Sequence, residues 1–319
     1  MTGPDAVRLD AALRQAAATL AAAGVASPRA DAEQLAAHVL KVPVGELVAA
    51  AVIGRALDPD DAARFAGLVE ARASRVPLQH LTGRAAFRRL ELEVGPGVFV
   101  PRAETEVAAG LAIEAASGFA AEFAASGIDG EVLVVDLCTG SGAIALAVAT
   151  EVPRARVVAV ELEPHAYAWA RRNVDALAPG RVELRLGDAA GADTGVLAEL
   201  AGRVDVLVAN PPYIPAGMRP VDEEVAEHDP AAALYGGGRD GLVLPRAVVA
   251  AAAGLLRPGG ALVMEHADSQ GAATRVIAGP PDWLDARTAG DLTGRDRVLL
   301  ARRAEVRGAT APQVRDFAT

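Results

Sequence analysis

The sequence predicts an α/β protein whose N-terminal part is helical. From about residue 105 onward, short apolar runs alternate with stretches of helical periodicity, which is typical of a parallel sheet wrapped by helices. Residues 1–75 show helical spacing without strand-like runs. A strictly alternating segment separates the two parts. We therefore expect a small helical bundle, a short β segment and then an α/β domain.

The N-terminal bundle is predicted over residues 1–75. Leu9, Leu13 and Leu20 fall on one helical face. Ser27 precedes Pro28, an N-cap and first-turn pair that opens a second helix. A turn rich in aspartate at residues 58–61 places acids at the positive end of another helix.

Residues 76–104 are predicted to link the two parts. Pro77 ends the last helix of the bundle, and residues 90–94 alternate between apolar and acidic side chains, as in a half-buried strand. Gly95-Pro96-Gly97 then turns the chain. The linker is therefore expected to be a short β-hairpin.

The α/β domain is predicted over residues 105–305, and residues 306–319, which lack periodicity, are expected to form a loose tail. The predicted strands are Val132–Val135, Arg156–Val160, Arg181–Leu186, Val204–Ala209, Ala261–Glu265 and Arg297–Ala301.

The composition narrows the function classes. The net charge is −10, whereas a duplex-binding protein normally needs a basic face, so no direct contact with nucleic acid is expected. Residues 1–84 hold nine basic and nine acidic side chains, so the acidic excess lies downstream. Cys138 is the only cysteine, which excludes an intramolecular disulfide. The five histidines show no metal-ligand spacing, and no metal is expected.

Neither a cleavable leader nor an uncharged apolar run of about 18 residues is evident. We therefore expect a cytoplasmic protein without membrane contact, and a monomer.

A glycine-rich loop follows the first predicted strand of the α/β domain. Residues 136–142 read Asp-Leu-Cys-Thr-Gly-Ser-Gly, and glycines there let the backbone approach a ligand at the carboxyl edge of the sheet. A tight strand-to-helix turn or a nicotinamide site would use the same glycines. The predicted cofactor-binding residues of this loop are Cys138, Thr139, Gly140, Ser141 and Gly142.

Acidic residues end the next two predicted strands. Glu161 can accept hydrogen bonds from both hydroxyls of a ribose, which indicates a nucleoside without naming it. Asp188 follows Gly187 and can accept from an adenine amino group, although a plain turn aspartate would look the same. Ala189 lies beside it, on the predicted adenine side of the site.

The sequence Asn210-Pro211-Pro212-Tyr213, here called the N-P-P-Y loop, directly follows the fourth predicted strand and is the most specific signal. Two prolines fix the backbone, so its carbonyls cannot fold back to pair within the chain. The Asn210 oxygen and the Pro211 carbonyl can accept the two hydrogens of one NH₂ group, and Tyr213 offers a flat wall.

Such a loop suits methyl transfer to a planar amide or amine. An amide nitrogen is a poor nucleophile, and it gains positive charge as it attacks a sulfonium methyl. Acceptors aimed at its hydrogens therefore help the transition state more than the ground state. Adenine N6 and guanine N2 would fit the same loop, so the loop indicates the chemistry without choosing between a base and a glutamine.

Segments outside this loop resemble the release-factor glutamine N5-methyltransferases, the PrmC/HemK family. Residues 75–83 are similar to the family's R-x-P-x-Q-Y-L-x-G, and residues 100–106 to its I-P-R-x-x-T-E. After the N-P-P-Y loop, residues 229–242 resemble E-P-x-x-A-L-x-G-G-x-D-G-L, with one extra residue in the glycine run. Residues 291–297 match D-x-x-G-x-x-R. The resemblance covers nearly the whole chain.

The resemblance implies a Rossmann-like class I methyltransferase domain preceded by a helical substrate-binding domain. It further implies S-adenosyl-L-methionine as the cofactor and class I peptide chain release factors as protein substrate, modified at the glutamine of the Gly-Gly-Gln motif. Asn210, Pro211 and Tyr213 become the expected catalytic residues, and Asn210, Pro211, Pro212 and Tyr213 the expected substrate contacts. Asn210 also joins Glu161, Asp188, Ala189 and the glycine loop in the expected cofactor site.

Several positions depart from the family pattern. Cys138 stands where the family more often has glycine, and Glu161 replaces an aspartate, which keeps the carboxylate but lengthens its reach. Ala189 is smaller than the usual residue against the adenine. Glu265-His266-Ala267 replaces the more usual E-I-G.

Three other functions compete with release-factor methylation. A ribosomal-protein glutamine methylase shares the motifs, and a nucleic-acid amino methylase shares the cofactor loop and the N-P-P-Y loop. A catalytically silent scaffold would retain the fold but lose site residues, and the intact set Gly140, Gly142, Glu161 and Asn210 argues against it.

Overall fold

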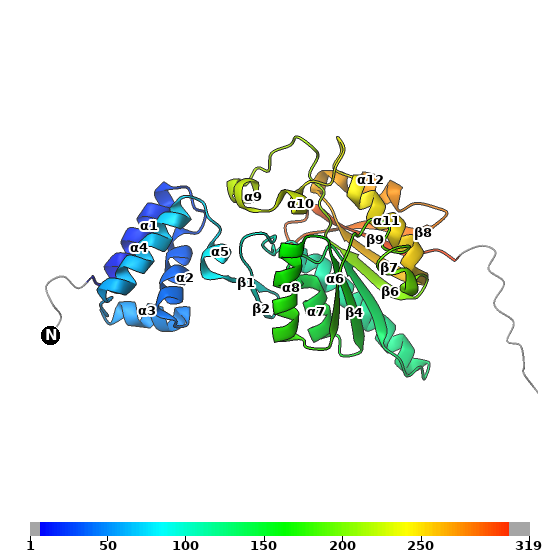
Figure 1. The fold of residues 1–319 in the computed structure, drawn as a ribbon, viewed down its shortest axis with the longest axis horizontal. Helices are drawn as coiled ribbons and strands as arrows, with labels where there is room; N and C mark the ends of the chain where they lie inside the picture. The colour runs from blue at the N-terminus through cyan, green and yellow to red at the C-terminus, as the bar shows by residue number, and fades with distance from the viewer. Residues whose placement is uncertain (1–6, 306–319) are drawn as a thin grey trace, which may run out of the picture. The chain divides into compact units, whose positions relative to one another are not determined.

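The computed structural model describes residues 7–305, which form two compact units (Figure 1). The first, here called the helical unit, comprises residues 7–86, 91–100 and 218–231. The second, the sheet unit, comprises residues 87–90, 101–217 and 232–305. The predicted tail at 306–319 lies outside the described residues.

The helical unit confirms the expected N-terminal helical region. Leu9, Leu20, Leu35, Leu47 and Phe65 form the centre of its core, and each is less than 5% exposed. Its helices are α1 (Leu9–Ala22), α2 (Pro28–Leu40), α3 (Val44–Val52), α4 (Pro59–Ala73), α5 (Leu78–Thr82) and α9 (Glu223–His228).

The first turns of α2 and α4 begin as the sequence predicts, with a proline after the cap residue. The Asp58 side chain caps α4 by accepting from the Asp61 amide at 2.8 Å. The expected side-chain cap of α2 is wrong in one respect, because Ser27 makes no capping hydrogen bond.

A buried cluster of charges joins α2, α4 and α9. The Arg72 guanidinium, in a residue only 5% exposed, donates to Asp31 Oδ2 at 2.7 Å and to Glu224 Oε1 at 2.8 Å. A third N–H of Arg72 bonds the Val76 carbonyl at 3.1 Å, and Arg75 adds a contact of 2.9 Å to Glu224. Residues 218–231 therefore belong to the helical unit although they follow the N-P-P-Y loop in sequence, which a division along the chain does not anticipate.

The linker contains a hairpin, as expected, but its turn lies at Arg88 and Arg89, before the predicted strand, and not at Gly95-Pro96-Gly97. Strands β1 (Arg84–Phe87) and β2 (Leu90–Glu93) form a two-stranded sheet. Leu92 is fully buried while Glu91 and Glu93 are exposed, as the alternation predicts.

The sheet unit is built on seven strands in the order β5-β4-β3-β6-β7-β9-β8 (Figure 1). The first five are parallel, and β9 and β8 are added antiparallel. The bounds are β3 (Val132–Leu137), β4 (Ala155–Glu161), β5 (Val182–Leu186), β6 (Val204–Ala209), β7 (Leu256–Glu265), β8 (Trp283–Gly290) and β9 (Asp296–Arg303).

Six of these strands were predicted from the sequence, and β8 was missed. β8 is an edge strand, and Trp283 is the only one of its residues that is fully buried. Without an apolar run or a clean alternation, such a strand leaves little signal. Strand direction also escapes sequence patterning, so the antiparallel pairing of β9 was not foreseen.

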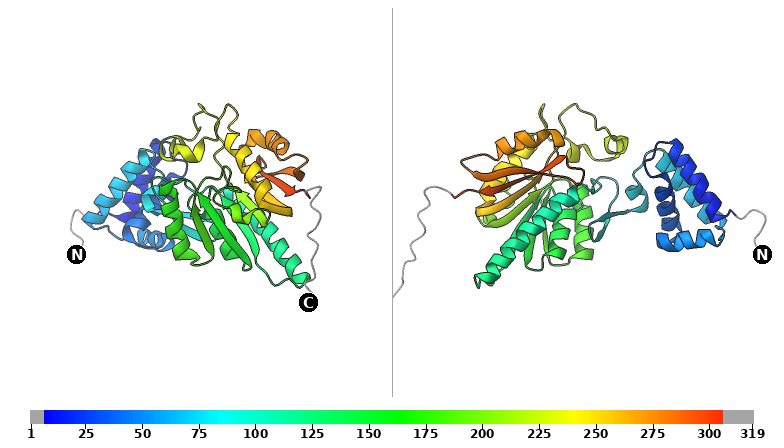
Figure 2. Two further views of the ribbon diagram at one scale, coloured as in Figure 1. Left: turned by 45° about the vertical axis from the view of Figure 1, so that its right-hand side comes forward. Right: turned by 180° about the vertical axis from the view of Figure 1, so that it is seen from behind.

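The helices of the sheet unit lie on both faces of the sheet (Figure 2). α6, α7 and α8 contact one another in chain order, and α11 contacts α12. The core between α11 and the sheet includes Leu137, Leu207, Val248 and Leu255. The bounds are α6 (Thr105–Ala125), α7 (Ala143–Glu151), α8 (Pro164–Leu177), α10 (Ala231–Leu234), α11 (Val243–Leu255) and α12 (Gly271–Ile277), with 3₁₀ turns at Ala198–Leu200 and Asp268–Gln270.

Helix α6 is the one single helix in the described chain that is long and apolar enough to cross a membrane by composition alone, and the bent pair α2 and α3 passes the same test together. α6 carries Glu114 and Glu122 and packs against α7, β6 and β7. The Arg257 guanidinium also lies 4.7 Å from the centre of the Phe119 ring. These contacts are those of a helix that covers a sheet.

We predict that R72A destabilises the helical unit by about 3–5 kcal/mol, because it leaves the buried Asp31 carboxylate without its partner and leaves Glu224 with Arg75 alone. The matched control is R29A, whose side chain is 81% exposed and, among the described residues, pairs with Glu33 alone; it should cost less than about 0.5 kcal/mol. Hydrogen exchange of the α2 and α9 amides would measure both effects. Equal protection in the two variants would contradict the prediction.

Candidate active site

Four neighbouring strands of the sheet unit end at one edge. Leu137, at the end of β3, is level with Val160 of β4 and with Ala209 of β6. Glu161 of β4 is level with Leu186 of β5. The glycine loop, Glu161, the Asp188 turn and the N-P-P-Y loop all begin here, so the segments predicted to form the site share the carboxyl edge of the sheet.

The glycine loop is held from beneath by Asp136, which the sequence prediction did not assign to the site. Its Oδ2 accepts from Thr139 Oγ1 at 2.6 Å and from the Ala145 amide at 3.0 Å. Its Oδ1 is buried and has no hydrogen-bond partner among the described residues. Burial raises the pKa of Asp136 to about 7. The sequence signal for Asp136 is a single acidic residue near the end of an otherwise apolar, buried strand.

The loop turns through three left-handed residues. Cys138 has φ of 61°, Gly140 of 60° and Gly142 of 85°. Cys138 thus occupies a conformation that favours glycine. Burial raises the pKa of the Cys138 thiol well above its ordinary value, so it is a poor nucleophile. No atom lies within 4 Å of a Cβ built on Gly140, so this position faces open space.

Glu161 joins the glycine loop to the start of α8. Its Oε2 accepts from the Gly140 amide at 2.7 Å and its Oε1 from the Glu163 amide at 2.9 Å. Burial raises the pKa of Glu161, while these backbone donors oppose the rise. Each carboxylate oxygen retains a lone pair for a further donor.

The residues of the Asp188 turn have structural roles in addition to the predicted cofactor contact. Asp188 is exposed, and its Oδ1 accepts from the Ala190 amide at 2.8 Å, as in an Asx turn. Ala189 is buried within the core on the α11 face. Gly187 is required by packing, because a Cβ there would lie 2.9 Å from Val196 Cγ2. Contact of Asp188 and Ala189 with a cofactor stays a prediction.

The N-P-P-Y loop is anchored through its two end residues. Asn210 Nδ2 donates to Thr105 Oγ1 at 3.2 Å, and the Tyr213 hydroxyl donates to Glu265 Oε1 at 3.3 Å. Within the described chain, no backbone hydrogen bond ends on the Pro211 carbonyl. The role of this carbonyl as an acceptor for a substrate stays a prediction.

The glycine run after the N-P-P-Y loop lies against its backbone. A Cβ on Gly236 would lie 2.5 Å from the Pro212 carbonyl oxygen, and one on Gly241 would collide with the Tyr213 carbonyl oxygen. Gln270 Nε2 donates to the carbonyls of Tyr213, at 2.9 Å, and Asp240, at 2.8 Å. The glycines therefore have a packing reason, and Gln270 is a further loop-holding residue that the sequence prediction missed.

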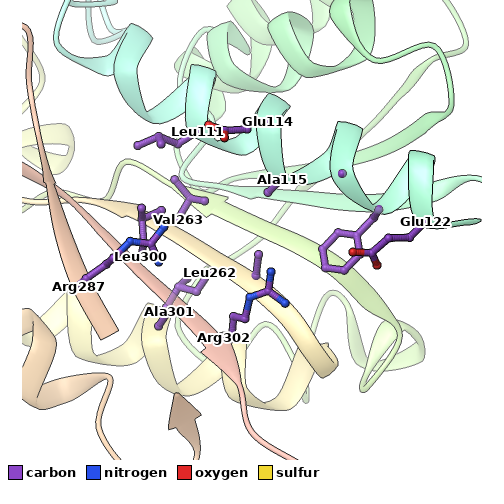
Figure 3. Close-up of a pocket in the computed structure, with 13 residues that line it drawn as sticks. Leu111, Glu114, Ala115, Glu122, Leu262, Val263, Arg287, Leu300, Ala301 and Arg302 are labelled. Atoms are coloured by element: carbon purple, nitrogen blue, oxygen red, sulfur yellow. The ribbon is translucent and has the colours of Figure 1, made fainter. Parts of the chain in front are cut away.

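A separate hollow of about 250 Å³ lies between α6 and the strands β7, β8 and β9 (Figure 3). Leu111 and Phe119 line it from the helix and Leu262 and Leu300 from the strands. None of the predicted site residues lines it. Across residues 7–305, no group of three or more His, Cys, Asp or Glu side chains is arranged to hold a metal ion.

Comparison with known proteins places this geometry in a family. Residues 11–83 match the PrmC N-terminal domain, and residues 113–228 match the methyltransferase small domain. The chain is 48% identical over 92% of its length to a release factor glutamine methyltransferase of Streptomyces coelicolor, covering 98% of that protein. It is also 48% identical to one of Mycolicibacterium smegmatis, covering 93% of this chain and 98% of that one. A relative from Deinococcus radiodurans is 38% identical over 92% of this chain and 97% of its own.

The chain belongs to the release factor glutamine methyltransferases. The family resemblance read from the motifs is thereby confirmed, as is the α/β methyltransferase fold behind a helical N-terminal region. A methyltransferase of this family therefore holds its N-P-P-Y loop next to a glycine loop, with Thr105 and Glu265 beneath it. Both of these residues lie in motifs quoted above, but their partners could not be read from sequence.

We predict that C138G is more stable than C138A by about 1–2 kcal/mol, because only glycine adopts the left-handed conformation without strain. Where φ is negative the order is reversed, with alanine ahead by about 0.5–1 kcal/mol. Denaturant unfolding of the two variants under one condition gives the comparison. A more stable alanine variant would refute the strained conformation of Cys138.

Proposed function

We propose that this methyltransferase transfers the methyl group of S-adenosyl-L-methionine to the side-chain amide nitrogen of the glutamine in the Gly-Gly-Gln motif of class I release factors. The observation that supports this proposal is the N-P-P-Y loop of a family member, held at the strand edge beside the glycine loop, whose Pro211 carbonyl accepts no backbone hydrogen bond from the described residues. This geometry supports a reaction in which acceptors hold an NH₂ group near a sulfonium.

The residues at the strand edge fit S-adenosyl-L-methionine. The open space at Gly140 leaves room for a ligand on the loop, and the buried, unpartnered Oδ1 of Asp136 offers an acceptor. Cys138, Thr139, Ser141 and Gly142 would complete the loop contacts, Glu161 would accept from the ribose hydroxyls, and Asp188 from the adenine. The cofactor supplies a methyl group on a positively charged sulfur.

The protein's own contribution is to hold the amide. The Asn210 Oδ1 and the Pro211 carbonyl each accept one hydrogen of the glutamine NH₂, which turns the nitrogen lone pair toward the methyl carbon. Such positioning contributes up to roughly 7–11 kcal/mol in favourable cases. Both acceptors gain as positive charge develops on the nitrogen. Pro212 and Tyr213 flank the planar amide group. Water accepts the proton that the methylated nitrogen releases.

We assign protein-substrate contact to the helical unit, including residues 218–231. That unit carries the match to the PrmC N-terminal domain and contains none of the expected cofactor-binding residues. The enzyme is proposed to act as a cytoplasmic monomer, without direct binding of nucleic acid.

The test is a methyl-transfer assay with purified release factor. We expect labelled methyl to appear on wild-type release factor and not on a Gly-Gly-Ala variant, because the alanine lacks the acceptor nitrogen. Ribosomal proteins and an adenine-containing oligonucleotide serve as the competing substrates. Methylation of either at a rate above that of the release factor would replace the proposed substrate.

We predict that N210A lowers turnover by on the order of 10²–10³-fold while cofactor affinity changes little, as when one preorganised polar group is removed from a transition state. Single-turnover assays with saturating cofactor measure the chemical step, and calorimetry measures the affinity. N210D is the companion variant, because it keeps an acceptor oxygen but removes the NH₂ donor. Wild-type turnover in N210A would remove Asn210 from the mechanism.

A further inference from the structure

Both anchored side chains of the N-P-P-Y loop lead to one buried carboxylate, Glu265, at the end of β7. The Tyr213 hydroxyl donates to Glu265 Oε1 at 3.3 Å, and Asn210 Nδ2 donates to Thr105 Oγ1 at 3.2 Å. The Thr105 hydroxyl stabilises the ionised form of Glu265. Glu265 is 3% exposed and Thr105 5%. Neither residue has been given a role in the reaction above, although both lie within the same compact unit as the loop.

The chemistry of these groups fixes the direction of the hydrogen bonds. An ionised carboxylate only accepts, and a hydroxyl has a single hydrogen. An ionised Glu265 can only accept, and the Thr105 side chain acts on it as a hydrogen-bond donor, so the Thr105 oxygen is left to accept from Asn210 Nδ2. Donors therefore run from Asn210 through Thr105 to Glu265, and from Tyr213 to Glu265. The Nδ2 end of the Asn210 amide is thus engaged, and Oδ1 is left to accept from another group.

We propose that Glu265 and Thr105 are positioning residues that hold the Asn210 amide with its oxygen toward the substrate and its NH₂ away from it. The inference rests on the proposed function, in which Asn210 Oδ1 accepts a hydrogen of the substrate amide. Because ionised Glu265 can only accept a hydrogen bond, the series of hydrogen bonds from Asn210 through Thr105 to Glu265 can run in this one direction only.

The two ends of an asparagine amide have nearly the same shape, so shape alone does not select one orientation. With a group at position 265 that can also donate, Thr105 is free to give its hydrogen to Oδ1 of a flipped Asn210. A flipped amide would present NH₂ to the substrate NH₂, two donors facing each other. The substrate nitrogen would then lose one of its two acceptors.

The surroundings of Glu265 allow the orientation to respond to pH. Burial raises the pKa of Glu265 to about 7, while Thr105, Arg297 on β9 and Tyr213 lower it and Glu104 raises it. Above pH 7 the carboxylate is ionised and accepts only. Below pH 7 the protonated carboxyl can also donate, so the hydrogen bonds between Glu265, Thr105 and Asn210 no longer have a single direction. Turnover should therefore rise as pH increases through about 7.

The sharpest test at Thr105 compares T105V with T105S. Valine keeps the shape and removes the hydroxyl, so we expect kcat to fall on the order of 10²-fold, as for a misplaced catalytic group. Serine keeps the hydroxyl and should retain most of the wild-type kcat. The KM for the cofactor should change less than about threefold in both, because the cofactor loop is untouched.

The test at Glu265 is the pH profile of E265Q. Glutamine keeps the shape but can donate, so we expect a reduced kcat and no rise through pH 7. Asp136 is another buried carboxyl of this unit whose pKa lies at about 7, so a rise that persists in E265Q would be assigned to Asp136 and would overturn the pH role of Glu265. D205N is the structural control. Asp205 is 4% exposed and bonds the Leu133 amide at 2.8 Å and Arg257 at 2.6 Å.

A readout besides activity is the side-chain NH₂ signal of Asn210 in ¹⁵N-resolved NMR, assigned by its absence in N210D. One of its hydrogens should be protected from exchange with water in the wild type and in T105S, and unprotected in T105V. Equal protection in all three, or wild-type kcat in both T105V and E265Q, would overturn the proposal. If the wild-type enzyme did not methylate release factor, the proposed function would be wrong. The NMR result would still report on the orientation of the Asn210 amide.

Discussion

The parallel pairing of β3 between β4 and β6 is the constraint on which the site depends. It sets Leu137, Val160 and Ala209 level at one edge, so that three loops far apart in sequence leave the sheet together. Parallel strands require a crossover between neighbours, and those crossovers supply α7 and α8. Each loop can then vary in sequence without losing its place, because the strand before it determines where it starts.

Loops that leave a sheet edge have no ladder to bond their backbone, and buried carboxylates take over that task here. Asp136 holds the glycine loop, Glu161 ties that loop to α8, and Glu265 holds Tyr213. In Asp136, Glu161 and Glu265, burial raises the pKa and hydrogen-bond donors oppose the rise. The site is therefore preorganised by three buried carboxyl groups, and the hydrogen bonds donated to them favour their ionised form.

The parts of this arrangement that were predictable from sequence are local ones. The glycine loop, Glu161 and the N-P-P-Y loop each follow an apolar strand directly, so their place at the edge could be inferred from order alone. Thr105 and Glu265 could not be paired with Asn210 and Tyr213 in this way. Thr105 lies 105 positions from Asn210, and no pattern within either segment encodes a contact over that distance. β8 was missed because an exposed edge strand lacks an apolar signature.

Two of the residues that make these long-range contacts lie close in sequence to segments of the helical unit. The helical unit ends at Val100 and resumes at Met218. Thr105 therefore follows its end after only residues 101–104, and Tyr213 precedes its return by only residues 214–217. These two residues are the ones that bond Asn210 and Glu265. The proposed substrate contact at the helical unit and the proposed orientation of the Asn210 amide are therefore separated along the chain by only these two four-residue segments.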